Sequence, residues 1–184
     1  SYWAELIEVD WTTDDCITTR DEIYSKNPEK YYLPDQFKNY ANFYAHYNLT
    51  WPYIFENLWK IDFFCAWLGT SWTLLWTAKF LKEKNPNIKI IWINPIDRIE
   101  WLRNFKTSKT IIPFYNEHKN LIDEVIDVNY EQDTFFWIKE MLSEWYFVGL
   151  SSWAIYSWLK KYLIWKKSLK WVFIAPDWWD FYLD

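Results

Sequence analysis

The sequence predicts an α/β fold in which helices flank a mostly parallel sheet. Apolar segments of strand length alternate with segments of helical periodicity, and the clearest unit runs strand, helix, strand between residues 61 and 93. A helix that joins two neighbouring strands makes them parallel, because parallel strands need a long crossover connection. The chain has 184 residues, which is long enough to build a sizeable core around such units.

The first 60 residues give the weakest signals. Residues 6–9 and 31–33 are short apolar runs that predict strands, and residues 21–26 predict a helix that ends at Asn27 and Pro28. Residues 39–58 are polar and aromatic, and we expect part of this stretch to be helical.

The central unit is the best defined. Residues 61–66 have the composition of a buried strand, and residues 74–84 have helical spacing with a basic last turn. A second apolar strand is predicted at residues 88–93. The loop at residues 67–73 is therefore expected at the carboxyl end of a strand.

The last third continues the alternation. A strand is predicted at residues 124–128, and helices are predicted at residues 130–144 and 154–163. Residues 170–175 form a last apolar strand. These elements complete the expected arrangement of strands and helices.

Tryptophan stands where glycine is expected. The chain contains 17 Trp and 2 Gly, whereas average usage predicts about 13 Gly in a chain of this length. Trp178 and Trp179 follow Pro176-Asp177, and Trp51 precedes Pro52. Such turn positions favour glycine, because it reaches positive φ without steric cost. We hypothesise that the natural gene encodes glycine by UGA codons, and that the printed sequence results from reading these codons as tryptophan.

A chain with genuine tryptophans is the alternative. Aromatic platforms bind sugars or bases by stacking, but they need their rings on one face, and the tryptophans here fall in loops, strands and helices alike. Read literally, Trp72 is expected to block close approach to its loop. Overpacking costs roughly 1–3 kcal/mol at each site, so the literal chain is expected to fold poorly.

Composition argues against several classes of function. The net charge of −5 disfavours a nucleic-acid partner, which needs a basic face. No apolar run approaches the roughly 20 residues of a membrane helix, and residues 1–5 lack a secretory signal, so the cytoplasm is the expected location. No metal site is expected, because no metal-ligand spacing occurs at Cys16, Cys65, His46 or His118.

Two segments are candidates for ligand binding. Gly69-Thr70-Ser71-Trp72-Thr73 stand between a strand and a helix, where unpaired N–H groups and the helix dipole favour an anion. With glycine at position 72, the backbone could close around a phosphate group. Ser151-Ser152 precede another predicted helix and could hydrogen-bond a ligand nitrogen. Each segment could instead be an ordinary helix cap, and the residues alone leave both interpretations open.

With glycine at the Trp positions, four segments resemble the cysteine synthase family of fold-type II pyridoxal-phosphate enzymes. Residues 66–84 become AGLGTSGTLLGTAKFLKEK, similar to the family's phosphate loop and helix. Residues 144–154 become EGYFVGLSSGA, similar to its EG-x-x-VGISSGA segment. Residues 36–52 resemble QF-x-N-x-AN…HY…TGP, and residues 176–183 resemble the closing PD-x-G-x-RYL. The segments occur in the family's order over nearly the whole chain.

The resemblance implies a three-layer α/β/α fold that binds pyridoxal 5'-phosphate. Residues 1–40 would be the tail of a smaller N-terminal domain, and residues 41–184 the larger domain that binds the cofactor phosphate. Ser151 would hydrogen-bond an unprotonated pyridine nitrogen, and Gln36 would help to hold the substrate carboxylate. Homodimers are usual in the family. The cofactor phosphate would be held by Gly69, Thr70, Ser71, position 72 (Trp72, read as glycine) and Thr73.

The implied reaction replaces the leaving group of an activated serine, O-acetylserine or O-phosphoserine, by sulfide to give cysteine. Residues 100–104 resemble a segment of the branch that uses O-phosphoserine, so Arg103 either binds a substrate phosphate or is a surface residue. The family's Schiff-base lysine lies upstream of the position that matches Ser1. No catalytic residue is therefore expected in this chain, and the chain alone is expected to be inactive. Cystathionine β-synthase, serine/threonine dehydratase and a non-catalytic binding module of the same fold stay open.

Overall fold

The core of the protein is a parallel sheet of four strands in the order β3-β2-β1-β4. The computed structural model describes residues 3–9, 12–58, 60–96, 104, 113–129, 135–163 and 168–177. Each strand pair of this sheet is parallel, as the strand-helix-strand pattern predicts. The strands are β1 (Phe63–Trp67), β2 (Lys89–Pro95), β3 (Glu124–Val128) and β4 (Trp171–Phe173).

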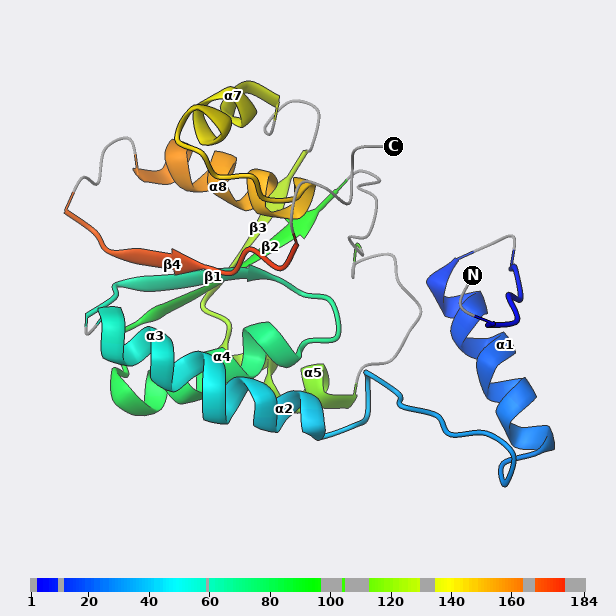
Figure 1. Ribbon diagram of the computed structural model, residues 1–184. Coiled ribbons are helices and arrows are strands. Elements are labelled where there is room, and N and C mark those ends of the chain that lie inside the picture. Colours follow the sequence, from blue (N-terminus) through cyan, green and yellow to red (C-terminus); the bar gives the residue numbers. More distant parts are fainter. Residues whose placement is uncertain are drawn as a thin grey trace.

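Helices cover both faces of this sheet (Figure 1). One face carries α2 (Ala41–Ala45), α3 (Trp51–Leu58), α4 (Trp72–Lys84) and α5 (Pro113–His118). The opposite face carries α7 (Phe135–Ser143) and α8 (Leu150–Leu163). A π-helical turn, His46–Thr50, joins α2 to α3, and a 3-10 turn, Lys119–Leu121, follows α5. The predicted three-layer α/β/α fold is confirmed.

Alternate residues of the central strands point to opposite layers. Phe64 and Ala66 of β1 pack in the core beneath α4, whereas Phe63 and Cys65 pack in the core beneath α8. The four apolar residues of β2, Ile90 to Ile93, alternate in the same way. Strands buried on both faces read as continuous apolar runs, which is why residues 61–66 and 88–93 were recognisable in the sequence.

Two predicted strands at the N-terminal end are wrong. Residues 6–9 and 31–33 have no regular structure, and Leu6 is 80% exposed. Neither apolar run lies beside a strand among the described residues, and a strand without a partner is not stable. The first helix is longer than predicted, because α1 runs over Thr13–Lys26. It begins at a capping box in which Thr12 and Asp15 bond each other's backbone N–H groups.

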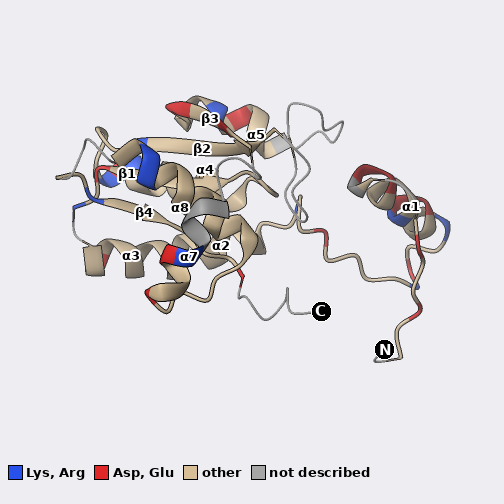
Figure 2. Ribbon diagram, turned by 90° about the horizontal axis from the view of Figure 1, so that it is seen from above, with Lys and Arg blue, Asp and Glu red and all other residues tan. Residues whose placement is uncertain are grey.

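Helix α1 lies apart from the sheet. Figures 1 and 2 show it at the end of an extended segment, away from the other helices. Figure 2 also shows acidic and basic residues spread over several elements rather than gathered into one basic face. Among the described residues, no helix is both long and apolar enough to cross a membrane.

The remaining predicted elements are confirmed with shifted bounds. The helix predicted at 154–163 begins at Leu150, so Ser151 and Ser152 lie in its first turn rather than before it. The last strand is shorter than predicted. The helix predicted at 130–144 is confirmed over Phe135–Ser143, and residues 130–134 lie outside the described residues.

Several tryptophans occupy conformations that suit glycine. Trp3 and Trp145 both have a φ of 63°, and both side chains are largely exposed, at 103% and 80%. A bulky residue in the left-handed region is sterically strained. The Trp76 ring centroid lies only 3.9 Å from that of Phe43, below the usual 4.5–7 Å or so for aromatic pairs. These features support the hypothesis that glycine is the natural residue at such positions.

Candidate cofactor-binding site

The sheet has a switch point beside β1. The connection from β1 to β2 runs through α4 on one face, whereas α8 leads into β4 on the other face (Figure 1). In open parallel sheets, ligands bind outside the carboxyl ends of the strands where the connections diverge in this way. The loop after β1 and the segment after β4 lie at this edge of the sheet, which defines the candidate site.

The loop after β1 has an accessible backbone. A Cβ added at Gly69 would meet nothing within 4 Å, and Gly69 is exposed. Ser71 precedes α4 in the left-handed conformation, with φ of 74°, and is only 2% exposed. Its hydroxyl has no hydrogen-bond partner among the described residues. The first N–H groups of α4 lack partners within the helix, so this loop can accept an anion.

Trp72 does not lie where we expected it. Its indole is buried, donates a hydrogen bond of 2.7 Å to the backbone oxygen of Gln36, and stacks on Phe114 at 4.8 Å. The literal side chain thus packs beneath the loop instead of covering Gly69, whose surroundings stay open. The contact also brings the main chain of Gln36 next to the predicted phosphate loop.

Thr73 belongs to a hydrogen-bonded chain that the sequence did not reveal. Its Oγ1 lies 3.2 Å from His46 Nε2, and His46 Nδ1 lies 3.3 Å from Thr50 Oγ1. A neutral imidazole offers one donor and one acceptor, so one hydroxyl donates to the ring and the other accepts from it. Protonation of His46 would make both ring nitrogens donors, so both threonine hydroxyls would then accept from the ring. His46 is therefore more than the surface or packing residue that its lack of ligand spacing suggested.

The pKa of His46 makes stability depend on pH. Burial lowers this pKa from its ordinary value, and burial together with Lys79 also lowers the pKa of His118. The unfolded chain, with a histidine pKa of about 6.5, then binds protons before the folded chain does. Stability is therefore complete above about pH 6.5 and declines as the pH falls below it.

We expect the urea midpoint of a His118→Gln variant to decrease as the pH is lowered from about 7 to about 5.5. When His46→Gln is added to this variant, most of the decrease in the urea midpoint should disappear, because glutamine does not titrate in this pH range. An unchanged pH profile in the double variant would show that His46 is not the group responsible.

Ser151 lies at the same edge of the sheet as the loop after β1. It is buried in the first turn of α8, and its backbone oxygen accepts a hydrogen bond of 2.7 Å from Trp67 Nε1 at the end of β1. Its hydroxyl donates to Asp177 Oδ1 at 3.2 Å. Asp177 follows β4, and its backbone oxygen accepts from Gly149 N at 3.1 Å. The two segments proposed from sequence therefore lie at one edge of the sheet.

Three polar residues at this edge were not predicted as site residues. They are His46, Asp177 and Asn94, the last fully buried in β2. Asn94 donates from Nδ2 to Asp127 Oδ1 at 2.8 Å, and its own Oδ1 has no partner within the described part of the chain. Its place near the carboxyl end of an apolar strand was the available signal. Arg103, the predicted substrate-phosphate residue, lies outside the described residues.

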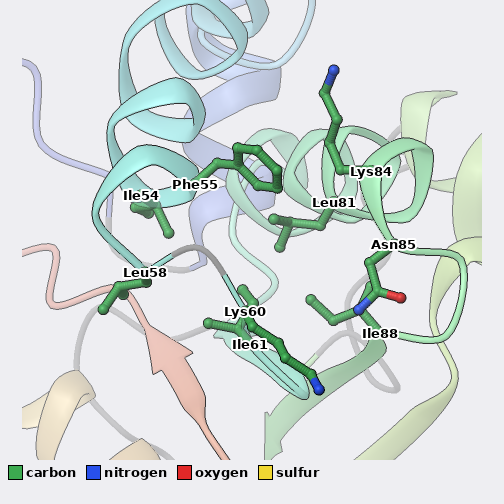
Figure 3. A pocket seen from close by; sticks show the side chains of 9 residues that line it. All are labelled: Ile54, Phe55, Leu58, Lys60, Ile61, Leu81, Lys84, Asn85 and Ile88. Carbon is green, nitrogen blue, oxygen red and sulfur yellow. The ribbon is translucent and has the colours of Figure 1, made fainter.

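A pocket of about 350 Å³ lies at the opposite edge of the sheet (Figure 3). It opens where α3 and the end of α4 meet the starts of β1 and β2, and apolar side chains line most of it. None of the predicted cofactor or substrate residues borders it, so it is separate from the candidate site at the carboxyl ends of the strands. Its lining residues are Ile54, Phe55, Leu58, Lys60, Ile61, Leu81, Lys84, Asn85 and Ile88.

Comparison with protein families decides the affiliation. The model of the family described as "Pyridoxal-phosphate dependent enzyme" matches residues 1–177. The chain belongs to the pyridoxal-phosphate-dependent enzyme family. Pyridoxal phosphate is the cofactor of this family, and the loop after β1 has the buried, unpartnered Ser71 hydroxyl and the open backbone described above.

Curated relatives in this family are cysteine synthases. The cysteine synthase of Aquifex aeolicus (strain VF5) is 33% identical over 144 residues, which are 77% of this chain and 44% of the relative. Cysteine synthase B of Escherichia coli (strain K12) is 31% identical over 124 residues, 65% of this chain and 40% of the relative. The chain thus spans less than half the length of these two relatives.

Solved structures of the family share the fold. A hydrogen sulfide-producing enzyme from Fusobacterium nucleatum superposes with a TM-score of 0.77 at 29% identity, over 92% of this chain and 60% of that one. An O-acetylserine dependent cystathionine beta-synthase from Helicobacter pylori gives 0.75 at 26% identity, over 95% and 60%. These structures are fold-type II enzymes, so the fold predicted from the resemblance is confirmed.

Proposed function

We propose that the complete protein is a cysteine synthase. It would replace the leaving group of O-acetylserine or O-phosphoserine by sulfide to form L-cysteine. The similarity to the cysteine synthases of Aquifex aeolicus and Escherichia coli supports this assignment. The observation in the protein itself that carries it is the shared sheet edge. The open loop backbone at Gly69 follows β1, and the first turn of α8, which holds Ser151, is bonded through Gly149 to Asp177 after the parallel strand β4.

The residues present fit pyridoxal phosphate. The unpartnered, buried hydroxyl of Ser71 and the open backbone at Gly69 suit the phosphate group. We assign the phosphate to Gly69, Thr70, Ser71, position 72 and Thr73. Ser151 is proposed to face the ring nitrogen, and Gln36 to help hold the substrate carboxylate, as the family resemblance implies.

The roles of these residues are binding and orientation. Pyridoxal phosphate, when bound, supplies the electron sink for the chemistry at the substrate's β-carbon. The loop and the first turn of α4 would fix the phosphate by backbone N–H groups and hydroxyls. His46 orients the Thr73 hydroxyl from below, because its Nε2 lies 3.2 Å from Thr73 Oγ1. Ser71, held in the left-handed conformation, turns the chain into the helix.

Other activities of the family are the second candidates. The similarity to the Helicobacter pylori O-acetylserine dependent cystathionine beta-synthase favours a thiol amino acid as an alternative to sulfide. Assay of the complete protein with O-acetylserine or O-phosphoserine, offering sulfide or homocysteine, separates the alternatives. Cysteine formation supports the proposal, whereas cystathionine alone, or no product with bound cofactor, contradicts it.

Gly69→Ala tests the phosphate assignment. We expect its stability to match the unaltered protein within about 0.5 kcal/mol, because the added Cβ meets no atom. Affinity for pyridoxal phosphate should fall about tenfold or more, since a methyl group hinders close approach of the phosphate. Equilibrium binding measured by fluorescence, with Gly69→Ser as a second variant, checks this. Unchanged affinity in both variants would place the phosphate elsewhere.

The remaining assignments follow from the same affiliation. We propose that residues 1–40 end a smaller N-terminal domain and that residues 41–184 belong to the larger domain. The complete protein is proposed to be a cytoplasmic homodimer whose partners are small-molecule substrates. Sedimentation of the complete protein tests the dimer.

A further inference from the structure

The pocket between α3 and α4 has no part in the proposed function. It lies at the amino ends of β1 and β2, and the candidate cofactor site lies at their carboxyl ends. Its volume of about 350 Å³ falls within the range of roughly 300–1,000 Å³ that small-molecule sites occupy. No tryptophan lines it, so its lining residues are the same whichever residue the natural protein has at the Trp positions.

Apolar side chains form most of the lining. Ile61, Leu81 and Ile88 are buried at the base of the pocket. Phe55 and Leu58 of α3 face them and are 36% and 46% exposed. Apolar surface that stays in contact with water is a source of binding free energy, because a hydrocarbon group that covers it releases this water. The lining therefore suits a ligand with a hydrocarbon part.

The charged side chains of the lining are both positive. They are Lys60 and Lys84, and no acidic side chain borders the pocket. Figure 3 shows the two lysines on opposite sides of the apolar lining. Among the described residues, neither ammonium group forms an ion pair. The carboxyl ends of α3 and α4 carry about half a negative charge each, so two ammonium groups leave the rim with a net positive charge.

Asn85 adds a hydrogen-bond donor of fixed orientation. Its Oδ1 accepts a hydrogen bond of 3.1 Å from the backbone N–H of Asn87, which determines which end of the amide is the oxygen. The Nδ2 group is then the end that Figure 3 shows beside Ile88, on the side of the pocket. An amide nitrogen only donates, so this group favours a ligand with an acceptor oxygen.

We propose that this pocket binds an amphipathic monocarboxylate, of the kind represented by a medium-chain fatty acid anion. The hydrocarbon part covers the apolar lining, and the carboxylate stays at the rim. There it accepts hydrogen bonds from the Asn85 amide and from Lys60 or Lys84, whose long, flexible side chains reach over apolar surface toward water. The net charge of −5 would repel such an anion elsewhere, which makes the positive rim selective.

Calorimetric titration of the complete protein with sodium octanoate tests the proposal. We expect a dissociation constant of about 1 mM or lower. Octyltrimethylammonium has the same hydrocarbon chain and the opposite charge, and it should bind roughly threefold or more weakly. Saturation with pyridoxal phosphate should leave the octanoate affinity unchanged, because the two sites lie at opposite edges of the sheet.

Three variants locate the site. The double variant Lys60→Ala, Lys84→Ala should weaken octanoate binding roughly threefold or more. Lys89→Ala is the matched control, because Lys89 is an exposed lysine at the start of β2 that does not line the pocket, and octanoate affinity should stay unchanged. Leu58→Ser removes apolar lining at a half-exposed position and should weaken the binding of both probes.

Three results would overturn the proposal. They are the absence of octanoate binding by the complete protein, equal octanoate affinity in the double variant and the unaltered protein, and loss of octanoate binding on addition of pyridoxal phosphate. The last result would place the probe at the cofactor site. None of these titrations depends on cysteine formation, so failure of the proposed function would leave the test of the pocket valid.

Discussion

Glycine is expected at positions 67, 72 and 76 when the tryptic peptide 61–79 from the natural source is sequenced by tandem mass spectrometry. The structure gives local reasons. The Trp76 ring is crowded against Phe43 at 3.9 Å, and its indole nitrogen has no hydrogen-bond partner among the described residues. A buried, unpartnered N–H group costs roughly 1–3 kcal/mol. Tryptophan in that peptide would refute the decoding hypothesis and favour a chain with genuine aromatic side chains.

The same hypothesis predicts an unusual effect on stability. Trp145→Gly in the printed chain should raise the free energy of unfolding, because Trp145 is exposed and has a φ of 63°. Relief of the left-handed strain, about 1–2 kcal/mol, outweighs the entropy that glycine adds to the unfolded chain, about 0.4–1 kcal/mol. Urea unfolding measures the difference.

Trp158→Gly is the matched control. Trp158 lies inside α8 and stacks on Tyr162 at 4.7 Å, so its replacement should destabilise the printed chain. If Trp145→Gly lost as much stability as Trp158→Gly, the positive φ of Trp145 would not be a source of strain that glycine relieves.

Gly149→Ala is expected to lower stability more than Gly69→Ala does. The new Cβ would overlap the Asp177 carboxyl group, which must then turn away from the start of α8 while the backbone bond between the two residues is kept. This movement removes the hydrogen bond that Ser151 donates to Asp177, and a hydrogen bond of this kind contributes about 0.5–1.5 kcal/mol. Chemical denaturation of the complete protein should show the loss.

Gly69→Ala provides the comparison for this variant. It adds the same methyl group at the same sheet edge, but into open space. Equal stability of the two variants would contradict the close contact between Gly149 and Asp177. Weaker cofactor binding by Gly149→Ala would show that this contact lies beside the cofactor site.

The fold was largely predictable because the central strands are buried on both faces. Residues 61–66, 88–93 and 124–128 were each placed within two residues of the observed strands. The predictions of strands at 6–9 and 31–33 were wrong, because a short apolar run gives no information on whether a partner strand lies beside it. Helix α1 was underestimated because its capping box at Thr12 and Asp15 was overlooked.

The candidate site was predictable only in its contiguous parts. Residues 69–73 could be proposed because a polar loop between a strand and a helix is a local pattern. The pairs Ser151–Asp177 and His46–Thr73 join residues 26 and 27 positions apart. Neither spacing corresponds to a helix turn or a strand repeat, so no local pattern could indicate that these residues meet.

The sequence by itself determined the α/β class with its mostly parallel sheet, the phosphate-loop candidate and the anomaly of the tryptophans, because these depend on composition and on periodicities of a few residues. Only the tertiary structure decided that Trp72 packs beneath its loop and that Ser151 donates a hydrogen bond to Asp177. Such contacts depend on how β1, β4 and α8 are brought to one edge of the sheet. Hydrogen bonds are directional over about 3 Å, so the donor and acceptor roles of a site emerge only when the packed elements place those atoms.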